Sequence, residues 1–214
     1  MIASRHLSLA LTAILALFVV QAWAGTPTDQ LKGSMDRVIK TLEDPALKQD
    51  AKAKERRDAV RKLANDIFDF AETAKRSLAR HWQARTDRER EEFIKLFGDL
   101  LERSYISKIE LYGGEKITYV GESLDGDFAT VRTKIATKQG SDVPIDYRML
   151  RRGERWLVFD ISIEGVSLIS NYRTQFNKII QTSSYMELVK KMKSKQEEFA
   201  FEEEAKAKGA AKKR

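Results

Sequence analysis

The spacing of apolar residues changes twice along this chain, and this change most limits how the chain can fold. Up to about residue 112 apolar residues recur at helical intervals, as Leu31, Met35 and Leu42 do. From about 116 to 163 they alternate with polar residues, as in the strands of an antiparallel sheet. Helical spacing then returns. A block of helices followed by a run of strands predicts an α+β fold with helices packed on the sheet.

Local signals indicate where the predicted elements begin and end. Thr86 and Glu89 have the spacing of a capping box at a helix start, and Asp125-Gly126 readily takes the positive φ angles of a tight hairpin. The whole pattern predicts helices over about 26–44, 50–82 with a break near Asn65, 86–112 and from about 184 onward, and four strands over 116–123, 128–137, 143–151 and 155–163.

The fourth predicted strand is apolar on both faces. With regular alternation, Phe159 and Ile161 share one face, while Trp156 and Val158 share the other. Such a strand should lie in the centre of the sheet or be covered on both sides. It ends at Glu164-Gly165 and is followed by another apolar run, so we expect a sharp turn into the next helix.

Residues 1–24 have the features of a signal peptide. Arg5 is its positive residue, an apolar run covers 7–20, and Ala22-Trp23-Ala24 is a small-x-small cleavage site. The alternative is a membrane anchor, but the apolar run is shorter than the roughly 20 residues that a span needs. Because the chain contains no cysteine, an exported form must be held by its core alone, and we expect a periplasmic protein.

The sequence offers little for catalysis. His81 is the only histidine after residue 24, there is no cysteine, and no phosphate-binding loop or nucleophile motif occurs, so we expect no metal, no cofactor and no enzyme activity. Asp160 and Glu164 are the carboxylates worth weighing as general bases near the end of the apolar strand. We favour the alternative that Asp160 binds backbone donors and that Glu164 is a solvated turn residue. For His81 we favour a place at the carbonyl end of a helix.

The formal charge of +7 does not indicate a nucleic-acid partner. Much of the excess lies in residues 190–214, which hold nine Lys or Arg and five Glu. We expect the part from 199 to 214 to be a disordered charged tail. The segment Arg151-Arg152-Gly153-Glu154-Arg155 is interpreted as a soluble hairpin tip, with a docking patch as the alternative.

Three segments carry a resemblance to a known family: "FDFAETAKRSLARHW", "FIKLFGDLLERSYISKIELY" and "WLVFDISIEGVSLISNYRTQF". Over about residues 30–195 the chain resembles the toluene-tolerance or MlaC-type family of periplasmic phospholipid carriers. The resemblance implies a nuclear-transport-factor-like cone with an added N-terminal helical part. It also implies a monomer that shuttles phospholipid between an outer-membrane lipoprotein–porin complex and an inner-membrane ABC transporter. The implied domains are a signal peptide at 1–24 and a lipid-binding domain at 25–198, made of helices to about 112, a sheet over about 113–165 and closing helices over about 166–198.

The excess of apolar faces has two interpretations. From periodicity alone an ordinary core is favoured, whereas the family resemblance favours a cavity that holds a diacyl phospholipid. Related lipid binders, including a branch associated with hopanoids, and an enzyme on a hydrophobic substrate remain alternatives. Arg173 could meet a phosphate at the rim or only water. The expected lipid-binding residues are Phe97, Leu101, Tyr105, Ile109, Val131, Ile135, Tyr147, Met149, Phe159, Ile161, Val166, Leu168, Ile169 and Tyr172.

We predict that export removes residues 1–24 and leaves Gly25 as the first residue, because the small residues Ala22 and Ala24 suit the signal peptidase. N-terminal sequencing of the protein from a bacterial periplasm checks this. A chain that keeps Met1 and stays with the membrane fraction would contradict it.

Overall fold

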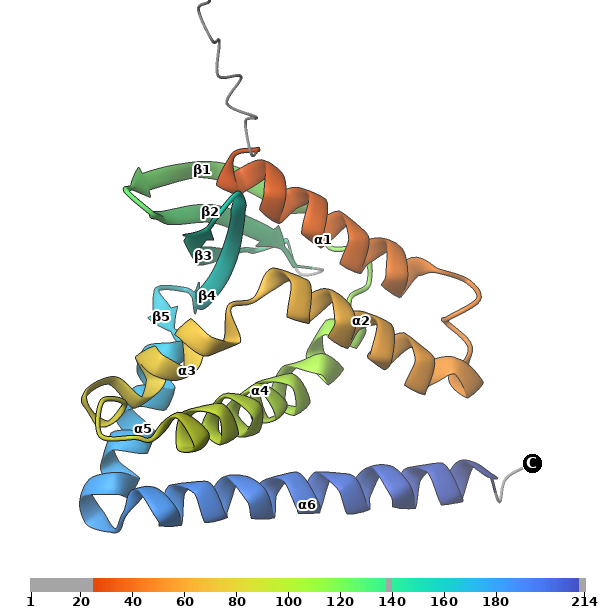
Figure 1. The fold of residues 1–214 in the computed structure, drawn as a ribbon. Helices are drawn as coiled ribbons and strands as arrows, with labels where there is room; N and C mark the ends of the chain where they lie inside the picture. The colour runs from red at the N-terminus through yellow and green to blue at the C-terminus, as the bar shows by residue number, and fades with distance from the viewer. Residues whose placement is uncertain (1–24, 138–139, 212–214) are drawn as a thin grey trace, which may run out of the picture.

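Helices cover one face of an antiparallel sheet and extend beyond it (Figure 1). The structure is a computed structural model that describes residues 25–137 and 140–211, so the predicted signal peptide lies outside the described residues. The elements are α1 (Pro27–Glu43), the 3-10 turn η1 (Asp50–Lys52), α2 (Ala53–Ile67), α3 (Phe70–Leu78), the 3-10 turn η2 (Ala79–His81), α4 (Asp87–Glu110), β1 (Ile117–Asp125), β2 (Phe128–Ala136), β3 (Asp142–Arg152), β4 (Arg155–Ile163), β5 (Val166–Ser167), α5 (Leu168–Thr182) and α6 (Tyr185–Ala211). The expected α+β class is confirmed.

Side-chain caps begin α1 and α4 where the sequence indicated, and one helix boundary is shifted. The Thr86 hydroxyl accepts from the backbone of Glu89, and the Glu89 carboxylate accepts from the backbone of Thr86, which completes the predicted capping box. The break between α2 and α3 lies at Phe68-Asp69 and not near Asn65. Asp69 causes this shift because its carboxylate accepts from Glu72 N at 2.8 Å and caps α3.

The sheet is an open meander with the order β1-β2-β3-β4-β5. Its fifth strand was not expected. Glu164 and Gly165 have φ values of 50° and 81°, so both central residues of the turn are left-handed and Val166 folds back to pair with Ile163. The helix that the sequence placed from about 166 therefore begins at Leu168.

A bulge in β4 overturns the predicted faces of that strand. The β3–β4 register shifts between Arg148 and Met149, so Phe159 is an extra residue in β4. Ile161 consequently packs in the same cluster as Trp156 and Val158. Phe159 lies instead against Phe128, with the ring centroids 6.2 Å apart. The prediction that Phe159 and Ile161 share a face was wrong, because regular alternation holds only without a bulge.

Two separate apolar clusters form the interior. The α1–sheet cluster joins α1 and the end of α2 to one face of the sheet, and its buried members are Leu31, Ile67, Ala129, Val131, Tyr147, Met149 and Val158. The helical cluster joins α3, α4, α5 and α6, and its buried members are Ala74, Leu78, Phe93, Leu96, Phe97, Ile169, Phe176, Tyr185, Leu188, Val189 and Met192. Figure 1 shows α4 and α6 side by side, away from the sheet that α1 covers.

Ion pairs attach the β3–β4 hairpin to its surroundings. The Arg152 guanidinium lies 2.8 Å from the buried Asp69 carboxylate, and the Arg151 guanidinium lies 2.6 Å from the exposed Asp127 carboxylate. Arg155 donates to the backbone oxygen of Asp66. The arginines of this tip therefore attach the hairpin to the rest of the fold. This weakens the interpretation of the tip as a docking patch.

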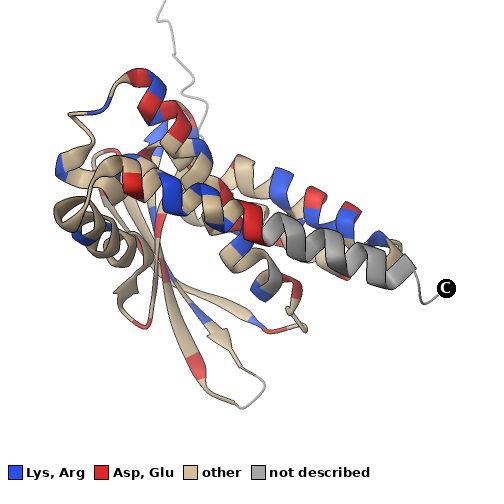
Figure 2. Ribbon diagram, turned by 90° about the horizontal axis from the view of Figure 1, so that it is seen from below, with Lys and Arg blue, Asp and Glu red and all other residues tan. Residues whose placement is uncertain are grey.

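The helices have mixed charge and none suits a membrane span. Figure 2 shows basic and acidic residues interspersed along the helices. No helix within 25–137 and 140–211 combines the length and the hydropathy that crossing a bilayer requires. The backbone of α6 continues as a helix to Ala211, past the boundary expected at residue 198, and the disordered tail stays a prediction.

We predict that Asp69→Asn lowers the free energy of unfolding by about 1 to 2 kcal/mol, because Arg152 loses a charge-assisted partner while the amide oxygen can still cap α3. Asp127→Asn is the matched control, since its pair with Arg151 is exposed, and it should cost less than about 1 kcal/mol. Urea unfolding measures both variants. Equal losses of unfolding free energy in the two variants would contradict the larger stabilising role of Asp69.

Candidate functional site

The expected lipid-binding residues divide by exposure into three groups. Those buried in the interior are Phe97, Val131, Tyr147, Met149, Phe159 and Ile169. Those half-buried are Leu101, Tyr105, Ile135, Ile161, Leu168 and Tyr172. Ile109 and Val166 are exposed, at 39% and 65%. Four of them, Phe97, Leu101, Ile169 and Tyr172, belong to the helical cluster or pack against it, and Val131, Tyr147, Met149 and Ile161 do the same in the α1–sheet cluster. The other six belong to neither cluster, so the structure does not bring the whole set together around one space.

The sheet part of the expected site is filled by α1. Leu31 of α1 is 1% exposed and packs with Val131, Tyr147 and Met149 in the α1–sheet cluster. Met35 and Val38, also on α1, pack against this cluster. In this arrangement the sheet face forms an ordinary core, and a ligand there would have to displace α1.

The aromatic part of the expected site is packed around α4 and α5. The Phe97 ring meets Tyr172 edge to face at a centroid distance of 5.0 Å and Phe176 at 5.2 Å. Phe93 meets Phe176 in the same way at 5.7 Å. Such edge-to-face pairs stabilise a packed cluster beyond the effect of burial alone. Phe93 lies on the apolar stripe of α4, and Phe176 lies on that of α5.

A half-buried apolar strip is formed by Leu101 and Tyr105 of α4 and Tyr172 of α5. Leu101 and Tyr172 pack against the helical cluster without being buried in it. Burial, together with the neighbouring Tyr172 hydroxyl, raises the pKa of Tyr105 to about 12. Ile109 continues the strip toward solvent. These side chains offer apolar surface that neither cluster covers completely.

Asp160 organises the turn before α5. Its carboxylate is 4% exposed, accepts from the Ser167 hydroxyl at 2.6 Å and accepts from Ile169 N at 3.1 Å. Arg148 lies 3.6 Å from the same carboxylate. Asp160 therefore binds a backbone donor in the first turn of α5, in line with the favoured interpretation, while Ser167 is the N-cap of that helix. Glu164 is exposed in the turn, and His81 Nε2 lies 2.9 Å from Asn177 Oδ1.

The exposed pair Ile163 and Val166 flanks this turn. The two residues are cross-strand partners in the β4–β5 hairpin and are 42% and 65% exposed. They lie at the outer tip of the hairpin and outside both clusters. Val166 as a cavity residue stays a prediction, with its side chain at the surface in this arrangement.

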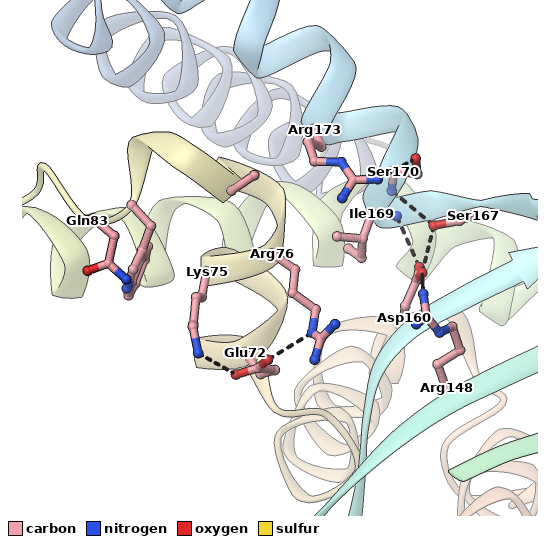
Figure 3. A pocket seen from close by; sticks show the side chains of 12 residues that line it. Glu72, Lys75, Arg76, Gln83, Arg148, Asp160, Ser167, Ile169, Ser170 and Arg173 are labelled. Carbon is pink, nitrogen blue, oxygen red and sulfur yellow. Dashed lines mark hydrogen bonds and ion pairs between the residues drawn. The ribbon is translucent and has the colours of Figure 1, made fainter. Parts of the chain in front are cut away.

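A polar pocket lies between α3 and α5, and the sequence did not predict it (Figure 3). Its volume is about 530 Å³. It is lined by Glu72, Lys75, Arg76, Ala79, Trp82, Gln83, Arg148, Asp160, Ser167, Ile169, Ser170 and Arg173. Only Asp160, Ile169 and Arg173 had been considered for function. The others come from elements that meet only in the folded chain, and no local motif joins them. Among the described residues no group of three potential metal ligands occurs.

Comparisons with known proteins agree on one family. The family model described as MlaC protein matches residues 32–194. The intermembrane phospholipid transport system binding protein MlaC of Haemophilus influenzae is 25% identical over 191 residues, covering 85% of this chain and 89% of that protein. A phospholipid-binding protein from Ralstonia solanacearum, solved in complex with a phospholipid, superposes with a TM-score of 0.71 and 24% identity over 82% of this chain and 99% of that chain. This last likeness supports the fold.

We predict a loss of stability in strong alkali. Burial raises the pKa of Tyr147 from 10.0 to about 12 against a weaker opposing effect of its hydrogen bond with Thr133. Because the folded pKa exceeds the unfolded one, the contribution is complete below pH 10 and is lost as the pH rises toward 12, by about 1.4 kcal/mol per pH unit.

Tyr147→Phe should remove this contribution and reduce the slope of unfolding free energy against pH in that window, while Tyr105, Tyr119 and Tyr185, whose pKa values are also raised to about 12, keep their contributions. Urea unfolding at several pH values, with tyrosinate absorbance followed in parallel, measures it. Equal slopes in the variant and the wild type would show that Tyr147 titrates as an exposed tyrosine does.

Proposed function

This chain belongs to the MlaC protein family, and we propose that it is a periplasmic carrier that shields the acyl chains of a diacyl phospholipid from water. The named relative from Haemophilus influenzae supports a role in intermembrane phospholipid transport. The Ralstonia solanacearum protein of the same fold was solved with a phospholipid, which supports that class of ligand.

The physical task of such a carrier is large. A diacyl lipid has on the order of 30 methylenes, and at about 0.8 kcal/mol each their exposure to water would cost roughly 24 kcal/mol. The carrier must replace the membrane interior with apolar side chains and leave no polar atom unpaired against them. The two clusters together contain enough large aliphatic and aromatic residues for such a lining.

We place the acyl chains between the two clusters. The single observation that carries this is the half-buried strip of Leu101, Tyr105 and Tyr172. Its apolar side chains are neither buried in a packed cluster nor fully exposed to solvent. The interior of each cluster is packed, so chains would enter as α4 and α5 move apart from the α1–sheet cluster. Ile161, half-buried on β4, offers the opposite wall.

Ion pairs would hold the outer side of this opening. Arg56 and Arg61 of α2 pair with Glu110 and Glu102 of α4, at the end of α4 that carries the strip. These pairs are partly shielded from solvent and keep α2 beside α4. We therefore expect α2, whose end belongs to the α1–sheet cluster, to stay in contact with α4 on this side while the opening forms.

The partners are proposed from the family resemblance. We propose that a monomer exchanges lipid with an outer-membrane lipoprotein–porin complex and with an inner-membrane ABC transporter. The chain contains no nucleotide-binding motif, so energy for net transport in one direction would come from such a partner. The engagement of Asp160 by Ser167 and Ile169 gives it a structural role and supports binding without turnover.

We predict that protein purified from a bacterial periplasm carries a diacyl phospholipid, seen by native mass spectrometry. Leu101→Glu should lower the bound fraction strongly, because a carboxylate that faces hydrocarbon costs several kcal/mol or must be neutralised. Leu111→Glu is the control, since Leu111 is 78% exposed at the end of α4, and it should load as the wild type does.

Circular dichroism checks that each variant is folded, and glutamate itself suits a helix. Should Leu101→Glu fail to fold, Ile109→Glu tests the same strip at a position that is 39% exposed. An empty wild type, or a folded Leu101→Glu protein with full loading, would contradict the proposed function.

A further inference from the structure

The polar pocket between α3 and α5 gathers positive charge from three elements. Lys75 and Arg76 come from α3, Arg148 from β3 and Arg173 from α5. In Figure 3 the guanidinium groups of Arg76 and Arg173 face the space between the two helices. The pocket has a volume of about 530 Å³, which suits a small ligand.

The two carboxylates of the pocket are already engaged. Glu72 is held by Arg76 at 2.8 Å, by Lys75 at 3.6 Å and by Arg152 at 3.5 Å. Asp160 accepts from Ile169 N in the first turn of α5 and lies 3.6 Å from Arg148. Four cations and two carboxylates line the pocket, so the lining keeps a net charge of +2.

Among the four cations of the pocket, Arg173 has the most N–H donors that are not engaged by carboxylates of the protein. Within the part of the chain that the structure describes, its guanidinium contacts the Ser170 hydroxyl at 2.9 Å and has no carboxylate partner. A guanidinium has five N–H donors arranged to grip a planar or tetrahedral oxyanion. Most of those donors therefore remain available to a ligand in the pocket.

Arg76 is fixed in position by the aromatic residue below it. Its guanidinium carbon lies 4.1 Å from the centre of the Phe159 ring, and its Nε donates to Glu72 at 2.8 Å. A cation stacked on a ring and paired at one edge keeps its outer N–H groups directed into the open space. Arg148, on the same ring at 5.2 Å, lies at the opposite wall.

We propose that this pocket binds a phosphate ester, with Arg173 and Arg76 as the main contacts. Paired guanidinium groups are the usual partners of phosphate, and the net charge of the lining matches a phosphate with one or two negative charges. Ser170 and Gln83 add neutral hydrogen-bonding groups at the rim. The ester is either a soluble one or the headgroup of a lipid, since both present the same oxygens.

A second pocket adjoins the first, because Arg76 and Arg148 line both. It has a volume of about 290 Å³ and has Leu124, Phe128 and Phe159 among its walls. An organic substituent on the phosphate can therefore lie against apolar side chains. This favours an ester over inorganic phosphate.

The test uses the full mature chain at low ionic strength. We expect glycerol 3-phosphate to bind the wild type in calorimetric titrations, more tightly than inorganic phosphate does, and the affinity to fall as salt is added. Arg173→Gln should weaken binding at least about tenfold, because a charge-assisted contact is lost. Lys178→Gln, which removes a charge on α5 outside the pocket, should leave the affinity unchanged.

Two outcomes overturn the inference: no binding of either probe to the wild type, or equal weakening in Arg173→Gln and Lys178→Gln. Competition with a short-chain phosphatidylglycerol identifies the source of the ester. Displacement of glycerol 3-phosphate indicates a headgroup, and simultaneous binding indicates a soluble ester. Because these titrations need no acyl-chain loading, a protein that never carries lipid but binds the ester contradicts only the proposed function.

Discussion

The backbone hydrogen bond from Asp69 N to the carbonyl oxygen of Val158, 2.8 Å long, joins the helical part of the chain to strand β4. Around it, Phe68 forms a parallel bridge with Val158, and the Asp69 carboxylate caps α3 while pairing with Arg152. One buried residue thus ends the helical run, starts the next helix and holds the β3–β4 hairpin. The interior divides at this point, because Ile67 at the end of α2 belongs to the α1–sheet cluster, whereas Ala74 and Leu78 of α3 belong to the helical cluster.

The division into two clusters affects where apolar side chains can contact a ligand. A chain with one continuous core would bury its apolar stripes completely, whereas two cores leave a boundary at which side chains are covered only in part. Tyr105 and Tyr172, which we propose as part of such a boundary, are half-buried and have hydroxyl groups that can pair with each other. Movement at this boundary disturbs the packing inside neither cluster, so opening there costs less than opening a core.

The sequence correctly predicted the features that depend on residues close together in the chain. The Thr86–Glu89 capping box, the turn at Asp125-Gly126 and the helical stripes rest on spacings of a few residues, and the structure has all of them. Features that depend on distant pairing were missed. The bulge at Phe159 exists only in register with β3, and the polar pocket exists only once α3 reaches α5 and β3. The helix break moved from Asn65 to Asp69 because Val158 supplies a partner that lies 89 residues later.

The central claim is that acyl chains occupy the boundary between the two clusters. Photo-crosslinking measures this directly, with a phospholipid that carries a photoreactive group within an acyl chain and is loaded onto the full mature protein. Peptide mapping should place the labels on the part of α4 that holds Leu101 and Tyr105 and on β4 near Ile161. Labels confined to outward-facing positions such as Val120 and Met186, which are 52% and 67% exposed, would contradict the claim.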